Sequence, residues 1–269
     1  MKRNSHVSVT HTTLFSADLY YMGSVLDLHC HTVHGSPDSE LSAAQLVEKA
    51  RQTGLTACCI TEHDKMWDKH HTETLSREFN VSFIRGMEVT TNLGHMIVYG
   101  LDHYVSGIHD AHALSRTVHA RGGLMIVAHP FRKLLLQLRY NANSPKAVIP
   151  TFEEACDFEV FKLVDEVEVL NGGTSDLENY FALRVARRLG FHGVSGSDAH
   201  SLHGVGRFTT VFYRDVTTVP ELVTEVKAGR YYPAQAERHG DERVEKPYSP
   251  GTVDPEIEER LKAAIAALA

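Results

Sequence analysis

Eight apolar runs of strand length recur along the chain, and helical patterns lie between many of them. An alternation of strands and helices is typical of a parallel sheet covered by helices, so the chain is expected to adopt an α/β fold. The runs span residues 25–30, 56–61, 81–89, 95–101, 124–128, 165–170, 192–196 and 208–213.

The first predicted helix has clear start and stop signals. Ser42 is placed to cap the helix together with Gln45, and Gly54 supplies the stop. Further helices are expected at 108–121, 174–189, 218–229 and 254–269.

The 269 residues divide into a main domain with flanking segments. Residues 25–235 form the main domain, residues 1–24 an N-terminal extension, and residues 236–269 a polar tail followed by the last helix. Within the main domain, 131–164 interrupts the strand–helix alternation, so we interpret it as an insertion or lid over the site.

Composition excludes several classes of protein. A formal net charge of −7 argues against general binding to long nucleic acid or to a membrane surface. Four cysteines, two of them adjacent in an apolar run, do not suggest a disulfide framework, which favours a cytoplasmic location. No apolar stretch approaches the roughly 20 residues of a membrane span.

His29 and His31 stand where the first strand gives way to a loop. Alternate side chains of a strand point to the same face, so both imidazoles can reach one metal ion. Other histidines and carboxylates stand at the ends of later runs, and His95 alone begins its strand. These further candidate ligands are Asp38, His63, Glu88, His95, His129, Asp198 and His200.

The residue types indicate which metals would bind. Imidazole and carboxylate ligands suit zinc, manganese or iron, and two or three such divalent ions can be held by nine ligands. If the strands close into a barrel, their carboxyl ends meet on one face and the scattered ligands become neighbours. A metal-dependent hydrolase is therefore predicted.

The order of these motifs resembles the polymerase and histidinol phosphatase (PHP) family over about residues 25–235. The resemblance rests on Asp27-Leu28-His29-x-His31-Thr32, Thr61-Glu62-His63-Asp64, Gly86-x-Glu88, Gly94-His95, Ala128-His129-Pro130 and Ser197-Asp198-Ala199-His200. It implies a distorted (β/α)7 TIM-like barrel and a phosphoesterase site in which a metal-bridging hydroxide, not a side chain, is the nucleophile.

The resemblance also implies how the ligands are divided among three ions. His29, His31, Glu88 and Asp198 would hold the first, and Glu88 would bridge to a second held by His95 and His129. Asp38, His63 and His200 would hold the third.

Two positions depart from the usual family pattern. Glu62 stands where the family commonly has aspartate, and Asp38 comes two residues later than in the commonest spacing. Glu62 keeps the negative charge and is expected to support the site from outside the ligand set.

Three residues beyond the metal motifs are candidates for binding substrate phosphate. Arg132 follows the His129 motif, and His203 and Arg207 follow the Asp198 motif. The planar guanidinium fork of arginine matches phosphate oxygens.

Together these observations predict an enzyme that hydrolyses small phosphomonoesters, such as a nucleotide or sugar phosphate. A phosphodiesterase or 3′–5′ exonuclease is an alternative because a similar site can attack a diester. A deaminase or lactonase of the amidohydrolase type is a further enzyme alternative, and a non-catalytic metal-binding scaffold is the alternative outside enzymology.

Overall fold

A computed structural model describes residues 23–105, 107–134, 150–240 and 242–266. Most of the predicted N-terminal extension, residues 1–22, lies outside the described residues. The same holds for residues 135–149 of the predicted insertion. The fold below concerns the described residues.

The main sheet has six strands in the order of the chain. Pairs β2–β3, β5–β6 and β6–β7 are parallel, whereas β4 runs antiparallel to both of its neighbours. The expectation of a parallel sheet is therefore wrong for β4, because only residues 92 and 93 separate it from β3 and so short a connection reverses the chain. The strands are β2 (Cys58–His63), β3 (Phe83–Thr91), β4 (Gly94–Tyr99), β5 (Leu124–Val127), β6 (Glu166–Asn171) and β7 (Val194–Gly196).

A second, antiparallel sheet of four strands lies beside the first, in the order β1-β8-β9-β10. Its last two strands occupy a stretch whose polar composition had not predicted strands. They pair antiparallel, from His239 opposite Glu242 to Ala234 opposite Pro247. The strands are β1 (Val25–Leu26), β8 (Phe208–Phe212), β9 (Tyr231–His239) and β10 (Glu242–Pro247).

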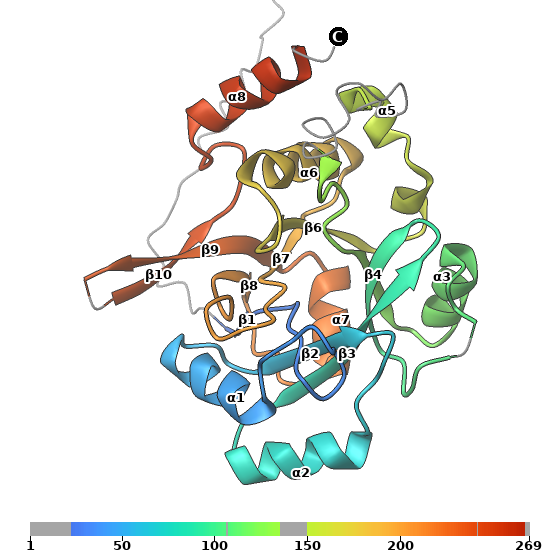
Figure 1. The fold of residues 1–269 in the computed structure, drawn as a ribbon, viewed down its shortest axis with the longest axis vertical. Helices are drawn as coiled ribbons and strands as arrows, with labels where there is room; N and C mark the ends of the chain where they lie inside the picture. The colour runs from blue at the N-terminus through green and yellow to red at the C-terminus, as the bar shows by residue number, and fades with distance from the viewer. Residues whose placement is uncertain (1–22, 106, 135–149, 241, 267–269) are drawn as a thin grey trace, which may run out of the picture.

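The segment 28–31, which continues from β1, closes the curl of the main sheet. The backbone N–H of His31 donates to the carbonyl of Ala199 beyond β7 (2.9 Å), and that of Thr61 in β2 donates to the carbonyl of Cys30 (2.9 Å). The first and last strands of the main sheet are thus joined through one segment. The predicted α/β fold, a distorted barrel, is confirmed (Figure 1).

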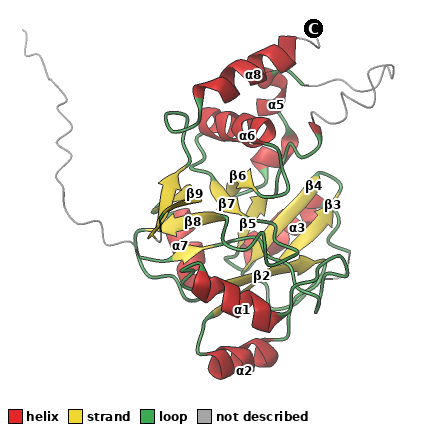
Figure 2. Cartoon of the chain, turned by 60° about the vertical axis from the view of Figure 1, so that its left-hand side comes forward, coloured by secondary structure: helices red, strands yellow, loops and turns green. Residues whose placement is uncertain are grey.

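Helices cover the barrel from outside, and Figure 2 shows α6 and α8 at one end and α1 and α2 at the other. The capping box predicted for Ser42 and Gln45 is formed. Helix α2 has a narrow apolar face: Thr72 is its one buried residue, and Leu75 and Phe79 pack against the core while partly exposed. The helices are α1 (Ala43–Gln52), α2 (Lys69–Phe79), α3 (Ala111–Ala120), α5 (Phe152–Cys156), the 3-10 helix η1 (Glu159–Lys162), α6 (Asp176–Leu189), α7 (Val219–Lys227) and α8 (Pro255–Ala266).

The apolar core packs on both faces of the main sheet. One cluster joins β3–β6 to α3 and α6, and another fills the barrel interior between Leu28, Tyr99 and Ile126. The Tyr99 hydroxyl donates to the carbonyl of Leu28 (2.8 Å), which holds the closing segment against β4 from inside. None of the described helices is long and apolar enough to cross a membrane.

Candidate metal centre

The nine predicted ligands lie together at one end of the barrel. His63 ends β2, His129 follows β5 and Asp198 follows β7, so each is carried to the same rim by its strand. His29 and His31 reach this rim from the closing segment. The two histidines lie with their ring centroids 5.0 Å apart.

Glu88 in β3 occupies the middle of the cluster and is 1 % exposed. It pairs with His63 in the sheet register, which brings two strands to the same point. Five imidazoles surround its carboxylate. Around Oε2 lie Nε2 of His29 (3.4 Å), Nε2 of His31 (3.4 Å) and Nδ1 of His63 (2.9 Å), and around Oε1 lie Nδ1 of His95 (2.9 Å) and Nε2 of His129 (3.0 Å).

Asp198 provides a second carboxylate opposite Glu88. Its Oδ1 lies 3.2 Å from Nε2 of His31, 3.6 Å from Nε2 of His29 and 3.5 Å from Nδ1 of His200. The two buried carboxylates thus share the imidazoles of His29 and His31. This arrangement places negative charge on both sides of one imidazole pair.

Asp38 lies at the outer edge of the cluster, and its side chain is 59 % exposed. Its Oδ2 is 3.4 Å from Nε2 of His63 and 3.4 Å from Nε2 of His200. The structure therefore brings Asp38 to the same two histidines with which the family resemblance groups it.

Four buried atoms at the centre make no hydrogen bond within the described chain: Nε2 of His29, Nε2 of His31, Oε2 of Glu88 and Oδ1 of Asp198. Buried polar atoms are rarely left without a partner, so their convergence indicates a bound cation. Three compact groups of ligand atoms could each hold one: His31, His63 and His200; His29, Glu88 and His129; and His29, His31 and Asp198.

The pKa values of the two central histidines are shifted in opposite directions. Burial opposes protonation of His29, but the carboxylates of Glu168 and Glu88 outweigh it and raise its pKa to about 10. Burial, followed by the positive charge of His29, lowers the pKa of His31 to about 2. His31 is therefore neutral at physiological pH, which is the form that binds a metal.

Backbone geometry directs two of the ligands into the cluster. His129 has φ +28° and Asp198 has φ +53°, both on the left-handed side that residues other than glycine seldom adopt. Such conformations concentrate at functional sites, where the surrounding structure compensates their cost.

Glu168 is a site residue that the motif reasoning missed. Its buried carboxylate lies 3.0 Å from Nδ1 of His29 and accepts from the backbone N–H of His129 (2.8 Å) and from Nδ2 of Asn171 (2.9 Å). A carboxylate behind a ligating imidazole fixes the orientation and tautomer of the ring. The signal in the sequence was a charged residue inside the apolar run of β6.

Glu62 lies behind the ligands, where it was expected. Its carboxylate accepts from the Ser36 hydroxyl (2.6 Å) and from Nε1 of Trp67 (2.7 Å). Oγ of Ser36 lies 3.0 Å from Nδ1 of His31. The Ser36 hydroxyl therefore links the Glu62 carboxylate to the imidazole of His31.

The three predicted phosphate-binding residues do not lie together. Arg132 contacts the Asp198 carboxylate and donates to Oδ1 of Asn171 (3.1 Å), so its guanidinium lies beside the cluster. Arg207 instead covers the ring of Phe208 and lines a separate cavity of about 230 Å³ under the C-terminal segment. His203 is exposed in the turn that follows His200.

Two curated proteins are similar to parts of the chain. An uncharacterized protein of Methanocaldococcus jannaschii is 27% identical over 115 residues, which are 39% of this chain and 67% of that protein. A 5′-3′ exoribonuclease of Haemophilus influenzae is 32% identical over 66 residues, and this match spans 24% of this chain and only 23% of that enzyme.

Two solved structures share the fold at low sequence identity. A two-domain protein of Bacteroides vulgatus, which contains a predicted PHP-like metal-dependent phosphoesterase, gives a TM-score of 0.55 at 16% identity over 87% of this chain and 69% of that one. A lesion-specific endonuclease of Pyrococcus furiosus gives a TM-score of 0.52 at 17% identity, over 91% and 72% respectively.

Family models match most of the region that carries the site. The model of the PHP domain matches residues 27–144, and a model described as PHP-associated matches residues 176–231. The first match contains His29, Glu88 and His129, and the second contains Asp198 and His200. Since the two matches together cover more than half of the chain, the protein belongs to the PHP family.

Proposed function

We propose that this protein is a metal-dependent phosphoesterase that hydrolyses small phosphomonoesters, such as a nucleotide or sugar phosphate. The observation that carries the proposal is the convergence of four buried atoms, from His29, His31, Glu88 and Asp198, that make no hydrogen bond within the described chain. Their donor set of imidazole and carboxylate suits zinc, manganese or iron. Membership in the PHP family supports the same reading.

The proposed ligand sets are those that the family resemblance implies, and the contacts of Glu88 and Asp198 support them. Glu88 is assigned as the bridging ligand because its two oxygens face different groups of histidines. The sets are His29, His31, Glu88 and Asp198 for one ion, Glu88, His95 and His129 for a second, and Asp38, His63 and His200 for a third.

Divalent ions in these positions would supply a hydroxide nucleophile near neutral pH and stabilise charge on the phosphoryl oxygens. Arg132 is proposed to bind a substrate phosphate oxygen beside them. Its guanidinium is already held at the edge of the cluster by Oδ1 of Asn171, and its Nε is buried without a partner in the described chain. A pre-positioned guanidinium loses little conformational freedom when it binds a phosphate.

Hydrolysis of a phosphodiester is the second candidate function. It is favoured by the similarity to a 5′-3′ exoribonuclease and by the shared fold of an endonuclease. The formal net charge of −7 counts against a long nucleic acid as substrate, because electrostatic attraction to the phosphate backbone supplies much of such binding.

The test is release of inorganic phosphate from a panel of phosphomonoesters by manganese- or zinc-loaded protein. We expect release by wild type and a loss of at least about 100-fold in His129→Ala. His112→Ala is the matched control, because His112 is an exposed histidine that pairs with Glu159 away from the site.

A labelled oligonucleotide and a dinucleotide are assayed in parallel. Shortening of the oligonucleotide without phosphate release from monoesters would replace the first proposal by the second. Equal activity of folded His129→Ala and wild type would contradict both proposals.

A further inference from the structure

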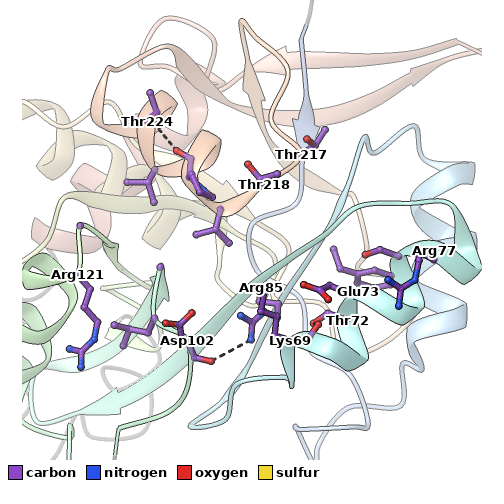
Figure 3. A pocket seen from close by; sticks show the side chains of 18 residues that line it. Lys69, Thr72, Glu73, Arg77, Arg85, Asp102, Arg121, Thr217, Thr218 and Thr224 are labelled. Carbon is purple, nitrogen blue, oxygen red and sulfur yellow. Dashed lines mark hydrogen bonds between the residues drawn. The ribbon is translucent and has the colours of Figure 1, made fainter.

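A second cavity, of about 860 Å³, opens between α2, the turn before β5 and the start of α7. Figure 3 shows the side chains that line it. Basic residues predominate among the charged ones: Lys69, Arg77, Arg85 and Arg121 line it together with Glu73 and Asp102. Its volume lies within the range of about 300–1,000 Å³ that is usual for small-molecule sites.

The cavity lies at the end of the barrel opposite the metal centre. Phe83 and Gly122, which line it, stand at or before the first residues of β3 and β5. The ligand Glu88 lies further along β3, and His129 lies just beyond the end of β5, toward the other rim. The cavity is therefore spatially separate from the metal centre.

The four cations of the lining form no ion pair among the described residues. Within the described chain none of them has a carboxylate oxygen within 4.0 Å, whereas other basic residues such as Arg230 and Arg243 do form ion pairs. Lys69, Arg77 and Arg121 are exposed. The lining thus carries four cations and two carboxylates in a chain with a formal net charge of −7, and such a local excess of positive charge attracts anions.

Arg85 is the fixed member of the group. Its Nη1 donates to the carbonyl of Trp67 (2.7 Å) and to that of Asp102 (3.4 Å), as the dashed line to Asp102 in Figure 3 illustrates. Two backbone acceptors thus hold its guanidinium, which leaves other N–H groups free to bind a ligand. Just before α7, the backbone N–H groups of Thr217 and Thr218 already donate to Glu221.

We propose that this cavity binds a phosphorylated small molecule at a site distinct from the metal centre. Guanidinium and ammonium groups from separate elements match the dispersed charge of phosphate oxygens. The volume exceeds that of one phosphate group, and Glu73 and Asp102 can accept hydrogen bonds from hydroxyl or amino groups on the rest of the ligand. These same carboxylates interrupt the positive lining, which disfavours a continuous nucleic-acid backbone.

The experiment is isothermal titration of the full chain with inorganic pyrophosphate, after dialysis into metal-free buffer so that the probe cannot bind through a metal ion. We expect one saturable site in wild type, whose dissociation constant rises at least tenfold in the double variant Lys69→Gln/Arg121→Gln. Both residues are exposed, so their replacement leaves the core intact.

Two controls separate the cavity from general charge and from the metal centre. Lys162→Gln/Arg188→Gln removes one lysine and one arginine elsewhere on the surface and should bind like wild type. His129→Ala should also bind like wild type, whether or not it has lost phosphatase activity.

Three outcomes would overturn the proposal: no saturable binding to wild type, equal binding by the cavity double variant, or loss of binding in His129→Ala. Competition by a short oligonucleotide at lower concentration than pyrophosphate would reassign the cavity to nucleic acid.

Discussion

His29 and His31 are chemically identical and two residues apart, yet their surroundings separate their proton affinities. Glu168 contacts the far side of the His29 ring, whereas a neutral hydroxyl, that of Ser36, contacts His31. Against the effect of burial, Glu168 and Glu88 raise the pKa of His29 to about 10, whereas burial and then the positive charge of His29 lower that of His31 to about 2. A metal ion must therefore displace a proton from His29 but not from His31.

This difference predicts a pH dependence of metal binding. Below about pH 10 the metal-free protein holds a proton on His29, so affinity should rise with pH as that proton becomes easier to displace. For one displaced proton the rise is about tenfold per pH unit. Titration with manganese at pH 6.5 and 8.5 should show it, and equal dissociation constants at the two values would contradict the assignment of His29 as a ligand.

Replacement of Glu168 tests the support behind the ligands. Glu168→Ala removes the acceptor for the His29 ring and for the His129 backbone N–H, so both ligands lose their fixed orientation. We expect metal affinity to fall about 10–100-fold, as is usual for partners of ligating histidines. Glu245→Ala is the control, since Glu245 is a buried carboxylate that contacts Arg243 and Thr209 instead. The same loss in both variants would point to general destabilisation.

Among the elements, β7 is the strand whose packing most closely limits the site. Gly196 ends this strand, and a Cβ there would lie 2.4 Å from Cβ of His29 and 2.8 Å from Oε1 of Glu168. Glycine is required because the closing segment passes so near to the strand. The close packing at Gly196 therefore fixes both the position of β7 and that of the ligand His29.

Gly196→Ala should therefore damage stability and metal binding together. Forcing a methyl group into a packed interior costs about 1–3 kcal/mol, and here the displaced atoms belong to His29. Gly251→Ala is the matched control, because a Cβ at Gly251 meets no atom within 4 Å. Denaturant unfolding with and without manganese measures both effects, and wild-type behaviour of Gly196→Ala would show that the strand and the closing segment can move apart.

For the whole molecule, the metal centre joins segments that are distant in the chain. It collects side chains from β2, β3, β4, the closing segment and the loops after β5 and β7. A cation that binds only the folded arrangement stabilises the entire barrel. The gain is about 2.7 kcal/mol when the free ion exceeds its dissociation constant 100-fold.

Metal removal should consequently lower the thermal unfolding midpoint. For a domain of this size about 2–4 °C correspond to 1 kcal/mol, so a decrease of roughly 5–10 °C is expected on dialysis against chelator and a recovery on adding manganese. Asp198→Ala should lose most of this response. An unfolding midpoint that is insensitive to metal would show that the cluster does not bind it in the folded state.

The sequence by itself determined which side chains could form the site and at which strand ends they stand. Strand periodicity places His29 and His31 on one face, and most of the apolar runs end in a ligand type, so the α/β fold and the residues of the cluster could be predicted without coordinates. Local rules suffice for these features because they involve neighbours in the chain.

Only the tertiary structure decided which residues meet. It placed Glu88 between five imidazoles, set Glu168 behind His29 across 139 residues, directed Arg207 away from the cluster and formed the basic cavity at the opposite end. These outcomes depend on how the sheet curls and closes, which is settled by packing among segments far apart in the chain, and no local pattern records that packing.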